Sequence, residues 1–297
     1  MSEDKKETIK KEKIRFLVFF WEFVLFSLTL FLGIITAKRI SHILEVQKVS
    51  LSPISPIQFI FYFIVGTLLI LFLIFFVKSK PKKGKIFKLL FVFSVFWGGL
   101  VVLNLWFNEI FPQTGGLLAF AIILFLIFLW FKKSNVFIHN LCIILAISGA
   151  GAVIGLRLNP ETMVLLLIIF SVYDFLAVYK TRHMVKMAKE MIGYGSALAL
   201  IIPQNFQGFR KKIEEISPGG KFLVLGGGDI AFPLLFSVSF VPQSLTYALV
   251  VAFFSLIGLF VTFLIFIKQR KKRPIPALPP IALFSIIGFL FTKTLIF

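Results

Sequence analysis

The sequence consists mainly of long apolar blocks, nine in all and each 17 to 24 residues long, separated by shorter polar and basic stretches. A helix of about 20 residues is long enough to cross a hydrocarbon layer roughly 30 Å thick. Only 15% of the residues are charged, whereas a soluble protein has about 25%. A soluble globular protein, a disordered chain and a disulfide scaffold are therefore excluded, and we predict an all-α membrane protein with nine transmembrane helices. The predicted spans are Phe16–Ala37, Ile57–Val77, Leu89–Phe107, Gly115–Phe131, Val136–Leu156, Pro160–Tyr179, Phe222–Val241, Ser244–Ile267 and Ile275–Thr292.

Basic residues lie almost entirely on one side of this predicted arrangement. Of the 32 lysines and arginines, 27 fall in the N-terminal tail and in the connections on its side of the membrane, and 5 fall on the other side. Cytoplasmic loops of membrane proteins carry the excess of Lys and Arg, so we place the N-terminus in the cytoplasm and the C-terminus outside. No small-residue cleavage site follows the basic tail, and the first span is expected to remain as an anchor.

The chain divides into four parts on this basis. Residues 1–15 form a basic cytoplasmic tail, 16–179 contain spans one to six, 180–221 form a cytoplasmic connection, and 222–297 contain the last three spans. The net charge of +19 comes from residues that flank apolar blocks, which indicates contact with membrane lipids and not with nucleic acid. The predicted localisation is a multi-pass integral membrane protein, in the cell membrane if the source is microbial.

Three of the 13 acidic residues fall inside the predicted spans, namely Glu22, Asp174 and Asp229. An ionisable group at the centre of a spanning helix costs roughly 2.5–3.5 kcal/mol, so each is a candidate functional residue. Asp174 lies five residues before the cytoplasmic end of the sixth span, and Asp229 lies seven residues after the start of the seventh. Helices adjacent in sequence are commonly neighbours, and we expect the two carboxylates to face each other at similar depth.

Two facing carboxylates in a medium of low dielectric constant do not both ionise easily, so this pair is expected to share a proton. One can then act as a base on a water molecule while the other polarises a carbonyl group, which is aspartic-protease chemistry. An ion or proton transporter also uses acidic pairs inside a membrane. The aspartates alone leave protease and transporter equally open, with a structural pair as the third alternative.

Irregular sequence adjoins the cytoplasmic face of the last three spans. Gly226, Gly227 and Gly228 precede Asp229, and glycine weakens a helix and lets another backbone approach closely. The cytoplasmic connection to the ninth span runs through the proline-rich stretch 274–280, which is expected to enter the membrane in a non-helical form. Such backbone is tolerated only against protein or a water-filled cavity. These features favour access for a peptide substrate.

Three short motifs follow one another along the sixth, seventh and ninth spans: Tyr173-Asp174, the GxGD pattern Gly226–Asp229 and the PAL pattern Pro276–Leu278. In these the chain resembles the presenilin/signal peptide peptidase family of intramembrane aspartyl proteases. The resemblance covers the C-terminal half in detail and the first five spans by number and hydropathy. The cytoplasmic N-terminus is similar to presenilins, whereas Asp229–Pro233 is similar to the signal peptide peptidase form, a combination that suggests a microbial, archaeal homologue.

The resemblance implies a presenilin-like fold and an intramembrane aspartyl endopeptidase that cleaves transmembrane helices of other membrane proteins, with an ion or proton transporter as the alternative. It implies Asp174 and Asp229 as the catalytic pair, no metal or organic cofactor, and transmembrane protein or peptide substrates, and it leaves open whether partner subunits are needed. The residues expected to shape the site and hold substrate beside the pair are Tyr173, Gly226, Gly227, Gly228, Pro276, Ala277 and Leu278.

A helix must be unwound before it is cut, and its freed backbone groups then need new partners. Leu223, Val224 and Leu225 have strand-like composition just before the glycines, and Ala197–Ile202 is a second short apolar run. We predict that an unwound substrate pairs as an added strand with Leu223–Leu225. The run Ala197–Ile202 is expected to supply a second strand that becomes ordered when substrate is present.

Other polar features are interpreted as structural. Glu22 is expected to pair with a polar group or to reach toward the interface, and His139 and Asn140 are expected to make packing hydrogen bonds. No HExxH motif occurs, so the sequence lacks the ligands of that type of zinc protease. The basic stretch Lys180–Glu190 is expected to extend the sixth helix along the membrane surface.

Overall fold

The structure is a computed structural model that describes residues 3–77, 80–181, 183–216, 222–269 and 273–294. Residues 1–2 of the predicted tail, 217–221 of the predicted connection and 295–297 after the last span lie outside the described residues. The α-helices are α1 (Glu3–Val46), α2 (Pro56–Phe76), α3 (Lys80–Ile110), α4 (Gly115–Lys133), α5 (Val136–Gly155), α6 (Pro160–Phe175), α7 (His183–Gly193), α8 (Gly227–Ser239), α9 (Leu245–Lys268) and α10 (Leu278–Thr294). The remaining elements are a π-helix (Leu176–Thr181), two 3₁₀ turns (Phe206–Arg210 and Ile213–Glu215) and the strands β1 (Ala199–Pro203) and β2 (Phe222–Gly226).

Each predicted span overlaps an apolar helix. Within the described parts of the chain, six helices are long and apolar enough to cross a membrane: α1, α3, α4, α5, α9, and α6 together with the π-helix. The apolar helical stretches Pro56–Ile70, Gly227–Ser239 and Leu278–Thr294 are shorter. Most residues are therefore helical, as the sequence predicts.

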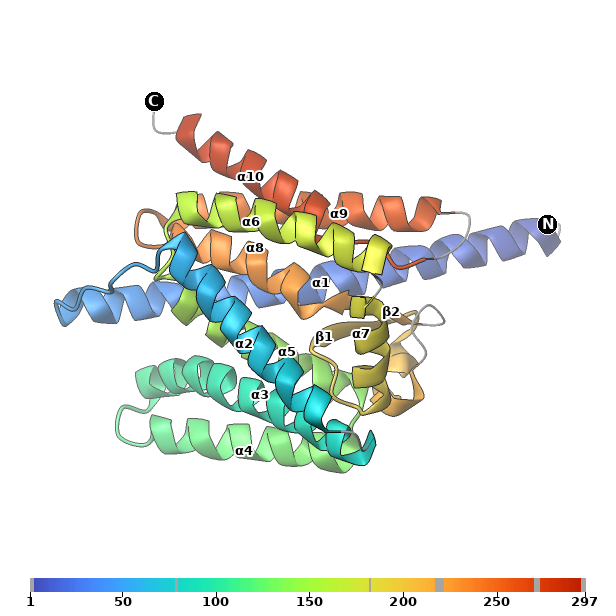
Figure 1. Cartoon of the computed structure of the whole chain (residues 1–297), viewed down its shortest axis with the longest axis horizontal. Helices are drawn as coiled ribbons and strands as arrows, with labels where there is room; N and C mark the ends of the chain where they lie inside the picture. Colours follow the sequence, from blue (N-terminus) through green and yellow to red (C-terminus); the bar gives the residue numbers. More distant parts are fainter. Residues whose placement is uncertain (1–2, 78–79, 182, 217–221, 270–272, 295–297) are drawn as a thin grey trace.

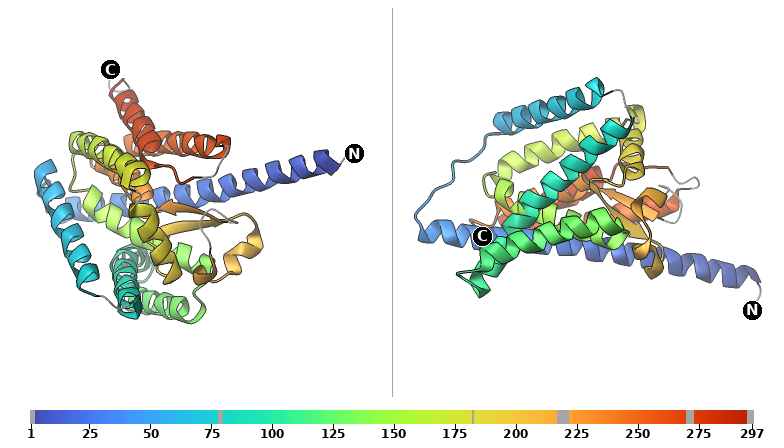
Figure 2. Two further views of the ribbon diagram at one scale, coloured as in Figure 1. Left: turned by 45° about the vertical axis from the view of Figure 1, so that its right-hand side comes forward. Right: turned by 90° about the horizontal axis from the view of Figure 1, so that it is seen from below.

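The helices form a bundle with α1 and α8 in its middle. Figure 1 shows α3, α4 and α5 on one side of these two helices and α6, α9 and α10 on the other. Helix α2 lies on the outside, against α6, and the second view of Figure 2 shows it standing apart from the other helices. The two strands and α7 lie together at one end of the bundle (Figures 1 and 2).

The local sequence fixes where several helices begin. Ser55 accepts a hydrogen bond from the Gln58 backbone N–H and its own N–H donates to the Gln58 side chain, which is a capping box. Asn135 accepts from the Ile138 N–H at the start of α5, and Pro160 opens α6, where its missing N–H is harmless. These signals place α5 and α6, which carry residues of the candidate site.

The seventh and ninth predicted spans are not helical over their full length. Residues Phe222–Gly226 form β2, and helix α8 begins only at Gly227 and is 13 residues long. The glycines end the strand, and their low helix propensity explains why no helix begins before them. At the ninth span, the stretch 273–277, which includes the first three residues of the span, is non-helical and α10 begins at Leu278, because Pro274 and Pro276 cannot donate helical hydrogen bonds.

A two-stranded antiparallel sheet corrects the all-α prediction. Strand β1 pairs with β2 in the register Leu200↔Leu225 and Ile202↔Leu223. The expectation that Ala197–Ile202 becomes ordered when substrate is present is wrong, since Ala199–Ile202 lie in β1 and are paired with β2 of the same chain. Beneath the sheet, a small apolar cluster that includes Ile192, Phe209 and Ile213 joins it to α7 and the 3₁₀ turns.

Candidate active site

Asp174 lies on the last turn of α6, one residue before its end, and the chain continues as a π-helix from Leu176 to Thr181. Its side chain is only 6% exposed. A π-helix is a wider, less stable turn that is found frequently at functional sites. Asp174 is thus a buried carboxyl at the point where regular α-helix ends.

Asp229 is the third residue of α8, directly after the strand-to-helix junction. The backbone N–H of Gly226, the residue that caps this helix, donates to its carboxylate. A side chain at this position commonly reaches back to the capping residue in this way, and the helix N-terminus favours a negative group. The junction therefore fixes the position of Asp229, which lies within electrostatic reach of Asp174.

The third component of the site is the backbone N–H of Leu278. It donates to Oδ2 of Asp174 at 3.3 Å and interacts with the Asp229 carboxylate as well. Leu278 is the first residue of α10, and the two residues after it are prolines, which have no N–H. The first N–H groups of a helix have no partner within that helix. Of the first three residues of α10, only Leu278 can therefore donate a hydrogen bond, and the aspartates are its acceptors.

The PAL segment is held against α9. Pro276 and Ala277 are buried in the non-helical stretch before α10, and the Thr262 hydroxyl on α9 donates to Gly258 O at 2.9 Å and approaches Ala277 O at 3.5 Å. A Cβ atom at Gly258 would come within 2.6 Å of the Ile281 Cα atom. Glycine at this position permits the close approach of α9 to α10, which sets the position of the Leu278 N–H.

A cavity of about 120 Å³ lies beside Asp229. Residues of β2, of the non-helical segment before α10, of α9 and of α1 line it. The residues that line the cavity are Glu22, Leu223, Val224, Leu225, Asp229, Thr262, Phe263, Phe266, Pro274, Ile275 and Ala277. The structure thus brings the predicted strand residues and part of the PAL segment together in the lining of one cavity that Asp229 also lines.

The sheet has one occupied edge and one that faces this cavity. On the β1 edge, Asn140 donates to Ile201 O at 2.8 Å and accepts from Ile201 N at 2.9 Å, and His139 Nε2 lies 3.1 Å from Ala199 O. These contacts give His139 and Asn140 the packing role expected from the sequence. Because they occupy the backbone groups of alternate β1 residues, a further strand can add only at the β2 edge.

The register shows which β2 groups point to that open edge. Ile201 is opposite Val224, and the Ile201 N–H and C=O are bonded to Asn140. Residues opposite each other in an antiparallel pair point their backbone groups either both inward or both outward. The N–H and C=O of Val224 therefore point away from β1, as does the Gly226 N–H that donates to Asp229.

The three glycines before Asp229 differ in their surroundings. Gly227 donates its N–H to Leu198 O at 2.9 Å, and a Cβ atom at Gly227 would come within 2.7 Å of that oxygen. A Cβ at Gly228 would meet nothing closer than 3.9 Å. Gly227, the middle position of the GxGD pattern, is thus the glycine that the packing of the strands requires, and not only a source of flexibility.

Tyr173 and Glu22 are two further residues that the sequence singles out. The Tyr173 side chain is 43% exposed, next in sequence to a buried aspartate. Glu22, interpreted as structural from the sequence, lines the cavity with Asp229. The aromatic residues Phe263 and Phe266 on α9 were not predicted as part of the site, and only the three-dimensional proximity of α9 identifies them.

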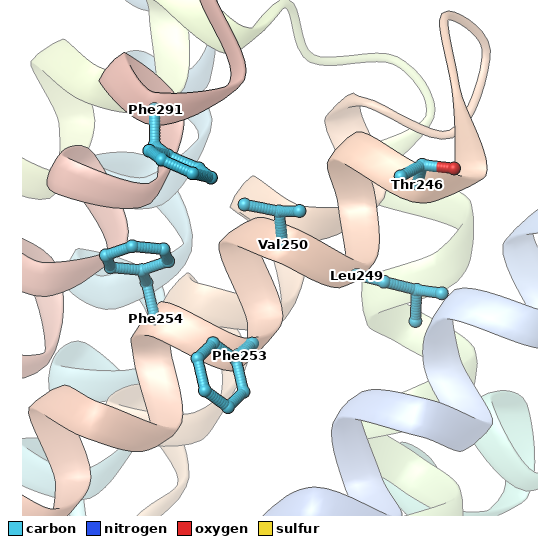
Figure 3. Close-up of a pocket in the computed structure, with 6 residues that line it drawn as sticks. All are labelled: Thr246, Leu249, Val250, Phe253, Phe254 and Phe291. Carbon is cyan, nitrogen blue, oxygen red and sulfur yellow. The ribbon is translucent and has the colours of Figure 1, made fainter. Parts of the chain in front are cut away.

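A second, larger pocket lies at the other end of α9, away from the aspartates. It is lined by Thr246, Leu249, Val250, Phe253, Phe254 and Phe291 (Figure 3). All of these except Thr246 are apolar, and Figure 3 shows that the Phe254 and Phe291 rings come from facing helices. This pocket has no group that could activate water, so the cavity beside Asp229 is the candidate active site.

Comparisons with known proteins agree with this geometry. The sequence model of the family described as "Signal-peptide peptidase, presenilin aspartyl protease" matches residues 23–296. Two solved structures of a presenilin family intramembrane aspartate protease, from P2 and C222 crystals, are 21% and 19% identical to the chain. They superpose with TM-scores of 0.61 and 0.60, over 91% of this chain and over 96% and 94% of theirs. No curated protein matches the chain in sequence.

The match extends over almost the whole chain, and it includes α6, β2, α8 and the PAL segment. The superposition shows that the helices are arranged as in these proteases. The chain belongs to the signal-peptide peptidase/presenilin family, and it is a multi-pass integral membrane protein and an aspartic-type endopeptidase.

Proposed function

We propose that the protein cleaves transmembrane helices of other membrane proteins, with Asp174 and Asp229 as its catalytic pair. The observation that carries this proposal is the single backbone N–H of Leu278, which interacts with both carboxylates. Two acidic groups from different helices that share one donor beside a cavity are placed to act on the same bond. Family membership favours this function over the ion or proton transporter, which has no support in the comparisons.

The proposed chemistry needs one ionised and one protonated carboxyl group. The ionised group takes a proton from a water molecule, whose oxygen attacks the peptide carbonyl carbon. The protonated group gives its proton to the carbonyl oxygen, so a gem-diol forms. When the C–N bond breaks, the leaving nitrogen takes up a proton and one new carboxyl and one new amine end result. The Leu278 N–H holds the pair in place during these transfers.

We propose further that the substrate binds as a strand at the open edge of β2. The outward-pointing Val224 groups and the presence of the PAL residue Ala277 in the same cavity lining support this arrangement. A substrate unwound inside the membrane has backbone groups that need partners, and added strands draw their affinity from main-chain hydrogen bonds. The helix N-terminus at Asp229 then lies beside the bond to be cut.

The proposed topology keeps nine spans, with a cytoplasmic N-terminus and an external C-terminus. The excess of basic residues on one side supports this orientation. In this topology the two-stranded sheet, α7 and both aspartates lie toward the cytoplasmic side. Helix α7 and strand β1 belong to the connection 180–221, and β2 and the aspartates belong to the adjoining ends of the sixth and seventh spans. Membrane lipids surround the spans, and transmembrane proteins are the partners that the function requires.

The test is cleavage of a single-span protein by the purified enzyme in detergent, followed by mass spectrometry. Asp174→Asn and Asp229→Asn should each lower the rate by about a thousandfold or more, because residues that act as a unit fail together. Glu161→Gln is a matched control, because Glu161 is an exposed acid at the other end of α6. The proposal is wrong if the wild-type protein cleaves no single-span substrate while ion flux in vesicles depends on the two aspartates.

A further inference from the structure

Glu22 lies on α1, far from the catalytic pair in sequence, yet it lines the same cavity as Asp229. Its side chain is 3% exposed, and its Oε2 atom has no hydrogen-bond partner among the described residues. A buried polar atom without a partner is uncommon in native proteins and requires an explanation. The two-aspartate chemistry uses no third carboxyl group, so Glu22 has a different task.

The residues around Glu22 indicate what kind of group would complete the cavity. Phe263 and Phe266 on α9 contribute aromatic rings to its lining, and Asp229 contributes a second acidic group. No lysine, arginine or histidine is present in the described lining of this cavity. Carboxyl oxygens and aromatic rings are the partners of an alkylammonium group, and an acid inside a membrane is commonly paired with a base.

We propose that Glu22 selects substrates that carry a lysine side chain beside the bond to be cut. This inference rests on the proposed protease function and on substrate binding at the β2 edge. Successive side chains of an added strand point to opposite faces of the sheet. Helix α1 packs against the sheet, because Trp21 and Leu25 contact both of the apolar clusters to which the strand residues belong. Glu22 lines the cavity together with Leu223, Val224 and Leu225 of β2, so a side chain of the added strand that points into this cavity approaches Glu22.

Transmembrane segments supply such a lysine at the predicted side of the membrane. Their cytoplasmic ends carry the excess of Lys and Arg. A lysine side chain can lay its four-carbon stem along apolar surface while its ammonium group reaches a polar partner. In this cavity Phe263 and Phe266 would receive the stem and Glu22 the ammonium group.

The experiment uses the full-length enzyme in detergent and a set of single-span peptides that differ only in one residue. A lysine is moved residue by residue through the region of the cleaved bond, with leucine at the same position as the reference, and kcat/KM is measured for each peptide. At one position, lysine should raise kcat/KM about tenfold over leucine. Glu22→Gln keeps the shape and an acceptor oxygen but removes the acid, and it should bring the ratio of kcat/KM for the lysine peptide to that for the leucine peptide down to about one.

Glu22→Asp provides a matched control because it retains the acid, and it should keep a preference for lysine. An equal loss of activity on every peptide in Glu22→Gln would overturn the inference, because Glu22 would then act on the aspartates and not on the substrate. A preference for lysine that survives in Glu22→Gln would overturn it as well.

A binding measurement tests the role of Glu22 independently of the proposed protease function. The Asp174→Asn variant should still bind the lysine peptide about tenfold more tightly than the leucine peptide, as measured by fluorescence anisotropy, because Glu22 is intact. Equal binding of the two peptides there would refute the role of Glu22, even if cleavage is confirmed. Failure of the wild type to cleave any peptide would refute the protease function alone, since the binding comparison does not depend on it.

Discussion

The backbone N–H of Leu278 donates to the Oδ2 atom of Asp174 at 3.3 Å, although the two residues are 104 positions apart in the chain. The same N–H interacts with Asp229. In the proposed mechanism the first turn of α10 would therefore belong to the catalytic apparatus, and it would act through the main chain and not through a side chain. The leucine of the PAL motif contributes its N–H, and the two prolines that follow it in the first turn have no N–H that could compete for the aspartates.

Removal of this donor should slow cleavage without unfolding the protein. Leu278→Pro deletes the N–H at the start of a helix, where proline is tolerated. A hydrogen bond to a charged group contributes about 1.5–3 kcal/mol, so kcat should fall about ten- to a hundredfold. Leu278→Ile retains the N–H and should stay close to wild type in a cleavage assay. Equal rates for the two variants would show that the contact has no part in catalysis.

Strand addition can be tested at Val224, whose N–H points to the open edge of β2. Val224→Pro removes this donor, and the preceding residue is already extended, as proline demands. We expect KM for a single-span substrate to rise strongly while the thermal unfolding temperature changes little. Val224→Ala keeps the N–H and is the control for the lost side chain. If the proline variant cleaves as well as the alanine variant, the substrate does not pair with this edge.

Alanine substitutions at Gly227 and at Gly228 should have different effects on the stability of the protein. In Gly227→Ala the added methyl group would approach Leu198 O within 2.7 Å, whereas in Gly228→Ala it would meet nothing closer than 3.9 Å. Gly227→Ala is expected to lower the free energy of unfolding by about 1–3 kcal/mol, the usual cost of forced overpacking. Gly228→Ala should leave it unchanged. Thermal unfolding in detergent measures both free energies, and equal effects would contradict the close contact of Gly227 with Leu198.

Asn140 should be essential for the sheet. Asn140→Leu removes both hydrogen bonds to Ile201 with little change in volume, so it leaves a buried N–H and C=O unpaired. Each such group costs about 1–3 kcal/mol, and the loss of stability should be accompanied by loss of cleavage. Asn108→Leu is the control, since Asn108 only bonds the Asn104 side chain on the same helix. Full activity in the Asn140 variant would show that β1 does not need this anchor.

The sequence was sufficient to predict the apolar helices and to identify the two aspartates as a pair. The length of the apolar blocks predicts the helices directly, because the thickness of a membrane sets the length of a helix that crosses it. Asp174 and Asp229 were identified because buried acids are costly and therefore rare in such blocks. Both residues lie on elements adjacent to a single connection, so their proximity follows from the order of the chain.

The parts that sequence reasoning missed depend on contacts between distant segments. The seventh span has the composition of a continuous apolar block, but its first five residues pair with β1. That partner is itself held by Asn140, about 60 residues earlier in the chain. Glu22 was interpreted as structural because nothing in its neighbourhood in α1 indicates that Asp229 lies near it. Hydrophobic periodicity and composition describe one segment of the chain at a time. The pairing of β1 with β2 and the proximity of Glu22 to Asp229 are contacts between distant segments, so neither property indicates them.

The enzyme's own seventh segment has the shape that its substrate would have to adopt. Residues Phe222–Gly226 are extended, the following 13 residues are helical, and Asp229 lies at the change from one to the other. A substrate laid alongside this segment would likewise be unwound on one side of the cut and helical on the other. Each cleavage would then release two unlike fragments. One would be a helical stub that stays dissolved in lipid, and the other an extended tail whose exposed backbone groups draw it into water.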